Sequence, residues 1–246
     1  MKKTIWAFVL IISIKAAFVS CSKNEDENNP TNGQTTALFN PKVDYGSLTD
    51  QDGNIYKTVR IGNQTWMAEN LRTTKYNDGT PIQNVSNDDD WLQLSTGAYC
   101  NYNNLSNVET IATYGRLYNG YAVITWKLAP KGWHVATDAD WATLIAYLDC
   151  EGYEANKLKE TGATHWNTTA TGANVTNETG FTAIPGGIRG PLSSFNEINY
   201  VAYLWCVEKE NSNNLWYLKM VYYSESLESG NNLSQLFGFS IRCVMD

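Results

Sequence analysis

Histidine is scarce in this chain, and so are the motifs that build most enzyme active sites. Only His134 and His165 occur among the 246 residues. There is no Gly-x-Ser-x-Gly, no His-Glu-x-x-His and no phosphate loop ending in Lys-Ser or Lys-Thr, so the common hydrolase, zinc-protease and nucleotide-binding signatures are missing. His134 lies in an apolar stretch and is expected to be structural, and the sequence shows no base or metal partner for His165. We therefore predict no catalytic residue and no cofactor.

Metal-binding spacings are missing as well. The five cysteines form no Cys-x-x-Cys pair and the histidines do not cluster, so a zinc site is not predicted. Residues 50–54 resemble the start of a calcium loop, but the later Glu and the flanking helices of that motif are absent. We expect no metal ion.

Positive charge is in short supply. Lys and Arg number 18 against 25 Asp and Glu, which gives a formal net charge of −7. Nucleic-acid binding needs a basic patch, and docking on anionic lipid headgroups needs clustered Lys or Arg. The composition argues against a nucleic-acid partner and disfavours tight binding to an anionic lipid surface.

The first 20 residues have the pattern of a secretory signal. Lys2 and Lys3 precede an apolar run at 5–14 that is too short to span a bilayer comfortably. Ser20 stands directly before Cys21, as at the cleavage site of bacterial lipoprotein signals, where the cysteine is acylated. We predict a lipoprotein signal peptide at 1–20 and lipidation of Cys21. The alternative is an ordinary cleaved signal with an incidental cysteine.

A polar segment follows Cys21. Residues 22–36 carry no core-forming side chain, and we predict a flexible acidic tether at 21–43. The acidic cluster at 25–27 resembles the signal that sends Bacteroidetes-type lipoproteins to the outer face of the outer membrane. Multiple acyl chains anchor a protein stably. The predicted location is the cell outer membrane, with a lipid anchor and the folded part facing outside.

Aromatic residues are abundant. The chain contains 9 Trp, 15 Tyr and 7 Phe, and apolar residues make up 43% of it, which is enough for a full core. Tyr and Trp also suit wet contact surfaces, because each has an apolar body and a polar group. An aromatic-rich β core explains much of the surplus, and a binding face is compatible with it. The length fits one main domain, predicted at 44–246.

The clearest helix is predicted at 138–149. Thr137 can cap it, and four apolar residues fall on one stripe at i, i+3, i+4 and i+7. These are Trp141, Leu144, Ile145 and Leu148. A second, shorter helix is predicted within 114–126.

Strands are predicted on both sides of these helices. Residues 48–71 indicate a β-hairpin with turns at 52–54 and 62–63, because both turns contain Gly and Asn. The region 162–200 is rich in Gly, Pro and polar residues and should hold little regular structure. Further strands are expected at 97–103, 131–137, 201–207, 215–223 and 237–244.

Five stretches occur in the order found in a known bacterial family. They are YKTVRIGNQTWMAENL, GAYCNYNN, YGRLYNGYAV, GWHVATDADW and GFSIRCV. Together they resemble the Fibrobacter succinogenes major paralogous domain over residues 44–246. The resemblance implies an α+β, C-type-lectin-like fold near the formylglycine-generating-enzyme type. Such a fold has a small twisted antiparallel sheet, two main helices and a long irregular loop region.

Two pairings of residues are also expected, the first from the resemblance and the second from the position of Arg242 on its strand. Cys100 and Cys243 lie inside the family-like stretches, which favours a disulfide between them among the three connectivities that Cys100, Cys150, Cys206 and Cys243 allow. Arg242, on the polar side of the last strand, is expected to pair with Glu69.

The calcium site of true C-type lectins is not present. The chain lacks both the Glu/Gln-Pro-Asn/Asp triplet and the Trp-Asn-Asp stretch of that site. A glycan would then be bound by aromatic stacking and amide hydrogen bonds. The candidate ligand-binding residues are Trp166, Asn167, Trp205, Glu208, Trp216 and Tyr223, whereas Trp66, Trp133 and Trp141 are assigned to the core.

We expect a surface-exposed lipoprotein with a non-catalytic ligand-binding domain. Its partner would be a glycan or a surface protein or fibre. Two alternatives stay open. One is an oxidative or hydrolytic enzyme on the formylglycine-generating-enzyme-like fold that uses His165 or a cysteine such as Cys206. The other is a structural subunit of a surface assembly such as a pilus tip.

Overall fold

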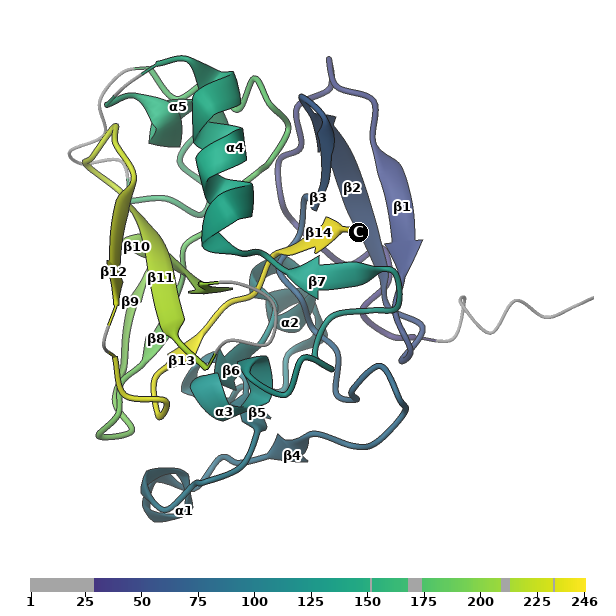
Figure 1. Ribbon diagram of the computed structural model, residues 1–246, viewed down its shortest axis with the longest axis vertical. Helices are drawn as coiled ribbons and strands as arrows, with labels where there is room; N and C mark the ends of the chain where they lie inside the picture. Colours follow the sequence, from purple (N-terminus) through teal and green to yellow (C-terminus); the bar gives the residue numbers. More distant parts are fainter. Residues whose placement is uncertain (1–28, 151, 168–173, 209–212, 232) are drawn as a thin grey trace, which may run out of the picture.

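The computed structural model describes residues 29–150, 152–167, 174–208, 213–231 and 233–246. The predicted signal peptide, Cys21 and the acidic cluster lie outside the described residues. The described chain has a mixed α+β architecture, mostly sheet with few helices. Figure 1 shows two sheets, with helix α4 (Asp138–Leu148) lying across the space between them. The predicted α+β class is confirmed.

The smaller sheet has five strands in the order β1-β2-β3-β14-β7. Their bounds are β1 Gly46–Thr49, β2 Ile55–Ile61, β3 Gln64–Met67, β14 Cys243–Met245 and β7 Trp133–Val135. Gly53 and Gly62 adopt φ values of 76° and 61° in the two turns, which glycine tolerates without strain. The predicted strand–turn–strand pattern at 48–71 is confirmed, and it continues into a third strand.

The larger sheet contains nine strands. Eight follow one path, β12-β11-β10-β8-β13-β6-β5-β4, and β9 pairs with β8. The pairs β10–β8 and β4–β5 are parallel, so the sheet is larger and less uniform than the predicted small antiparallel sheet. The bounds are β4 Gln83–Asn84, β5 Ala98–Cys100, β6 Leu117–Asn119, β8 Gly186–Arg189, β9 Phe195–Ile198, β10 Val201–Val207, β11 Leu215–Val221, β12 Glu228–Asn231 and β13 Gly238–Phe239.

Helix α4 begins with a capping box. The side chain of Thr137 accepts from the Asp140 backbone amide at 3.2 Å, and the Asp140 carboxylate accepts from the Thr137 amide at 2.8 Å. In the described part of the chain the other helices have at most seven residues, so the expectation of two main helices is met by only one. They are α1 Asp88–Leu92, α2 Val108–Tyr114, α3 Gly120–Val123, α5 Glu154–Leu158 and a 3-10 turn at Tyr102–Asn104. The helix predicted at 114–126 is strand β6 followed by the single turn α3.

Aromatic side chains form the core beneath α4. Trp66 lies 4.7 Å from Trp141 and 5.6 Å from Phe181 between ring centroids, and all three are buried. Such tilted and edge-on pairs add to the stabilisation from buried area. The assignment of Trp66 and Trp141 to the core is confirmed.

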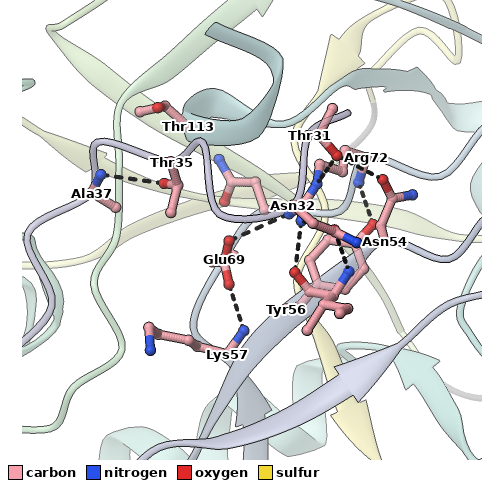
Figure 2. Close-up of polar contacts among 12 residues, drawn as sticks. Thr31, Asn32, Thr35, Ala37, Asn54, Tyr56, Lys57, Glu69, Arg72 and Thr113 are labelled. Atoms are coloured by element: carbon pink, nitrogen blue, oxygen red, sulfur yellow. Dashed lines mark hydrogen bonds and ion pairs between the residues drawn. The ribbon is translucent and has the colours of Figure 1, made fainter. Parts of the chain in front are cut away.

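Residues 29–43, here called the N-terminal strap, lie against the domain (Figure 2). Arg72 donates from Nε to the Thr31 hydroxyl at 3.0 Å, and the Asn32 side chain accepts from the Ile55 amide at 2.8 Å. Phe39 and Val43 pack on the core. The prediction of a flexible tether reaching residue 43 is therefore wrong for the strap, because its amide and hydroxyl side chains bond to the domain.

The predicted disulfide is not formed. Cys100 lies in β5 of the nine-stranded sheet, Cys243 lies in β14 of the five-stranded sheet, and both are free, buried thiols. Cys150 and Cys206 are also free. The two cysteines lie in different sheets, and their shared occurrence in family-like stretches therefore did not indicate proximity.

Candidate functional site

A hollow of about 640 Å³ lies between the end of α3 and strand β7. We call it the tryptophan hollow. Two indoles contribute to its wall together with polar and charged side chains. The residues used below are Asn77, Trp126, Lys131, Trp133, His134 and Asp246.

The backbone holds both tryptophans at the wall. Trp126 has a φ of 60°, a left-handed conformation that a bulky residue rarely adopts, and its amide donates to Val123 at 3.3 Å. The amide of Trp133 donates to Pro130 at 3.0 Å, across a turn in which Gly132 has a φ of 79°. Both indoles are half-buried. The core assignment of Trp133 is confirmed in part, because its side chain packs against the core but stays partly exposed. Trp126 was not singled out, because its place depends on the left-handed turn.

His134 is held between two carboxylates. Its Nε2 lies 3.0 Å from Asp140 and its Nδ1 lies 2.7 Å from Asp246. The hydrogen bond to Asp140 and the second to Asp246 outweigh burial and raise the pKa of His134 to about 9. The imidazole is then protonated near neutral pH with both nitrogens occupied, so it suits a fixed charge better than a general base.

Asp140 ties this site to the helix. Burial alone would raise the pKa of Asp140, but hydrogen bonds from His134 and Thr137 lower it overall. The same carboxylate forms the α4 capping box. The Asp140 carboxylate therefore links the start of α4 to His134, which lines the tryptophan hollow.

The lining of the hollow combines two kinds of surface. The indoles offer apolar faces, and the exposed Lys131 and Asp246 with the Asn77 amide offer donors and acceptors. Ligand sites are typically concave and mostly apolar, with a few convergent polar groups and perturbed titratable residues. The hollow combines these features: two partly exposed indoles, a few polar groups and His134 with its raised pKa.

Two predicted ligand-binding residues are buried instead. Trp205 is fully buried, with its indole N–H donating to the Tyr118 carbonyl at 2.8 Å. Trp166 is 3% exposed and donates to the Ala183 carbonyl at 3.0 Å. Neither ring presents a face to solvent, so both belong to the core. Trp166 is flanked by His165 and Asn167, which suggested a surface position, whereas Trp205 lies in the apolar run 201–207, whose burial is decided by the packing of both faces of β10.

Glu208 and Trp216 come together at a second hollow of about 320 Å³. We call it the amide hollow, because Asn213, Asn214, Asn231 and Gln235 also line it. Glu208 accepts from the Asn214 amide group at 2.5 Å.

Tyr223 and Asn167 lie apart from both hollows. Tyr223 is 58% exposed and its ring centroid is 5.0 Å from that of Tyr222. The amide of Asn167 donates to the Asn199 carbonyl at 2.8 Å. Of the six candidates, the structure therefore places Glu208 and Trp216 at one hollow and the other four elsewhere.

His165 has a carboxylate partner that the sequence did not reveal. Its Nδ1 lies 2.7 Å from Glu160 and its Nε2 lies 3.0 Å from the Thr36 hydroxyl. The order hydroxyl–imidazole–carboxylate matches an activated nucleophile. However, the amides of Thr36 and Leu38 donate to Thr113 and Glu160, so these two are not available to stabilise an oxyanion. The contacts fasten the N-terminal strap.

Two further properties concern the described residues as a whole. No three His, Cys, Asp or Glu side chains there are grouped so that they could hold a metal ion. None of the helices in the described ranges combines the length and apolar character needed to cross a bilayer.

The comparison with known families gives one match. The family described as the Fibrobacter succinogenes major domain matches residues 59–245. No curated protein and no solved structure matches the chain.

Proposed function

We propose that this chain, which belongs to the Fibrobacter succinogenes major domain family, is a non-catalytic ligand-binding module whose tryptophan hollow holds a neutral glycan. The observation that carries the proposal is the pairing of two half-buried indoles, Trp126 and Trp133, with the fixed His134–Asp246 pair at one hollow. Indoles can stack on the apolar face of a sugar ring, while the polar groups bond to its hydroxyls.

Charge favours a neutral ligand. The chain carries a formal net charge of −7, which repels acidic polymers over the whole surface. At the hollow itself, His134 contacts the carboxylates of Asp140 and Asp246, and Lys131 adds a positive charge to the lining, so charges of both signs are present. Recognition would then rest on shape, stacking and hydrogen bonds.

The proposal extends to fold type and location. We propose a C-type-lectin-like architecture on the strength of the family resemblance and the α+β class, although this chain has a larger, mixed sheet and one long helix. Binding would not require calcium. An acyl group on Cys21 would hold the module at the outer face of the outer membrane. Radiolabelled fatty acid should be incorporated into the full chain and lost in Cys21→Ser. Equal incorporation in both would refute the anchor.

A glycan array with full-length exported protein tests the central proposal, with and without a chelator. Binding should survive the chelator. Trp133→Ala and Trp126→Ala should each weaken it about tenfold or more, which corresponds to about 1.4 kcal/mol for a central aromatic contact. Tyr223→Ala removes an exposed aromatic outside the hollow and is the matched control. Unchanged binding in both tryptophan variants, or loss in Tyr223→Ala alone, would contradict the assignment.

The enzyme alternative draws on the Thr36–His165–Glu160 contacts. A hydrolase would show turnover of activated esters that disappears in both His165→Ala and Thr36→Val. The thiol version has less support, because burial raises the pKa of Cys206 to about 12 and keeps the thiol protonated. Glycan binding without turnover would favour the binding module. If the protein bound no glycan on the array and instead captured one partner protein, a structural subunit would be favoured.

A further inference from the structure

The amide hollow has the chemistry of a sugar-binding surface without being part of the tryptophan hollow. Four carboxamide side chains line it, and each can donate and accept, as vicinal hydroxyls do. Trp216 is half-buried and adds an aromatic surface. The hydrogen bond between Asn214 and Glu208 holds two of the polar groups in place before any ligand arrives.

The two hollows are neighbours on either side of α3. Thr137 lines the tryptophan hollow and forms a parallel bridge with Val207, the residue directly before Glu208 of the amide hollow. At the first residue of α3, the amide of Gly120 donates to the Gln235 carbonyl at 2.8 Å. At its last residue, Val123 lines the tryptophan hollow. Helix α3 has four residues and therefore extends only about 6 Å along its axis.

We propose that the amide hollow is a second subsite for the same ligand, so that the ligand is an extended neutral polysaccharide chain rather than a terminal sugar. The inference rests on the proposed function of the tryptophan hollow. One chain would stack on Trp126 and Trp133, pass α3, and reach Trp216 and the carboxamides.

The charge of the second subsite supports a neutral chain. Glu208 is an acceptor in its ionised form and repels carboxylate or sulfate groups. Among the described residues that line the amide hollow there is no Lys, Arg or His, in contrast to Lys131 and His134 at the tryptophan hollow. A uronic-acid polymer would therefore meet an unfavourable surface as soon as it extended past α3.

Occupation of both subsites by one chain predicts a dependence on length. The second contact is intramolecular once the first has formed, so long oligosaccharides should bind at least tenfold more tightly than disaccharides. A terminal-sugar lectin would show no such rise.

The test uses affinity electrophoresis of the exported protein in gels with xylan, mannan, mixed-linkage glucan or polygalacturonate. Oligosaccharides from the retarding polymer, from disaccharide to octasaccharide, are then titrated calorimetrically. Trp216→Ala should weaken octasaccharide binding about tenfold and leave disaccharide binding unchanged. Trp133→Ala should weaken both. Trp216 packs on the core, so a second variant that retains it is needed. Gln235→Ala changes the amide hollow without touching Trp216. It should weaken octasaccharide binding by a smaller factor and leave disaccharide binding unchanged.

The outcomes separate the two proposals. Absence of binding to every polymer overturns the proposed function. If binding does not depend on oligosaccharide length and Trp216→Ala leaves the affinity unchanged, the second subsite is refuted. The proposal for the tryptophan hollow then still stands. Strongest retardation by polygalacturonate overturns the neutral-chain assignment. Length dependence that is lost in Trp216→Ala and reduced in Gln235→Ala supports the extended site.

Discussion

The Nε group of Arg242 donates a hydrogen bond to the side-chain oxygen of Asn70 at 2.8 Å. The rest of the guanidinium donates to the carbonyls of Met67, Phe181 and Thr182. Arg242 therefore links the end of the chain to β3 and to the loop that carries Phe181. The expected pairing with Glu69 is wrong, because Glu69 contacts Arg72 at 3.3 Å instead.

Replacing Arg242 by Met should destabilise the domain by about 3 kcal/mol or more. The variant keeps volume but leaves one amide oxygen and three carbonyls without their donor, and each such loss costs about 1–3 kcal/mol. Urea unfolding followed by tryptophan fluorescence measures the change. Arg60→Met removes an exposed Arg and should stay within about 0.5 kcal/mol. Equal effects of the two variants would show that Arg242 is not a structural link.

The His134–Asp140 pair should make stability depend on pH. The folded pKa of His134 is about 9 against an ordinary 6.5, so its contribution is complete below pH 6.5 and is lost as pH rises towards 9. The lowered pKa of Asp140 adds stability above its ordinary 3.8, which is lost at more acidic pH. Because His134 is partly exposed, the alkaline loss should be about 1 kcal/mol.

Unfolding free energies at pH 6 and pH 9 test this expectation. The wild type should lose stability across the interval, and His134→Gln should lose much less. A variant with the same slope as the wild type would place the titrating group elsewhere.

Glu160→Gln should loosen the N-terminal strap. Glu160 accepts from the Leu38 amide at 2.6 Å and from His165, so its neutral amide analogue weakens both bonds. Hydrogen exchange should accelerate in peptides from 29–43, with a stability loss of about 1–3 kcal/mol. Glu109→Gln changes an exposed carboxylate and should leave the strap protected. Unaltered exchange in Glu160→Gln would show that other contacts hold the strap.

Three thiols should be inert in the folded protein. Burial raises the pKa of Cys100 to about 12 and raises that of Cys243 further above its ordinary value, and Cys206 is buried likewise. Maleimide should therefore modify the half-buried Cys150 first, and all four only after denaturation. Peptide mass mapping identifies the sites. If the native protein changed mass on reduction, and the change mapped to Cys100 and Cys243, the two cysteines would be shown to form a disulfide after all.

Local signals in the sequence predicted part of the fold. The apolar stripe at 138–149 correctly predicted helix α4, in which Trp141, Leu144 and Leu148 are buried. This prediction succeeded because helix periodicity and a Thr cap depend on residues within a turn of one another. Strand β10 has the predicted bounds 201–207. The segment 237–244 was expected to be one strand with one apolar face. It is divided into β13 and β14, and residues 238–244 are all buried because each half joins a different sheet.

The candidate site was harder to predict, because it depends on tertiary contacts. Trp126 reaches its hollow through a left-handed turn, and Glu160 meets His165 only when a loop folds back. Glu208 and Trp216 lie near the ends of the paired strands β10 and β11, which the sequence did predict, and the structure places both at the amide hollow. Trp166 and Trp205 failed as contact residues, since exposure of an aromatic is decided by the packing of distant segments.

The most direct test of the account follows indole N–H resonances while glycan is added. The chain has nine tryptophans. Trp66, Trp141 and Trp205 are buried in the core and serve as internal controls. With an oligosaccharide from the polymer that retards the protein, the Nε1–H signals of Trp126 and Trp133 should shift in a saturable manner. The signals of the three buried indoles should stay in place. Saturable binding that leaves Trp126 and Trp133 unshifted would contradict the account.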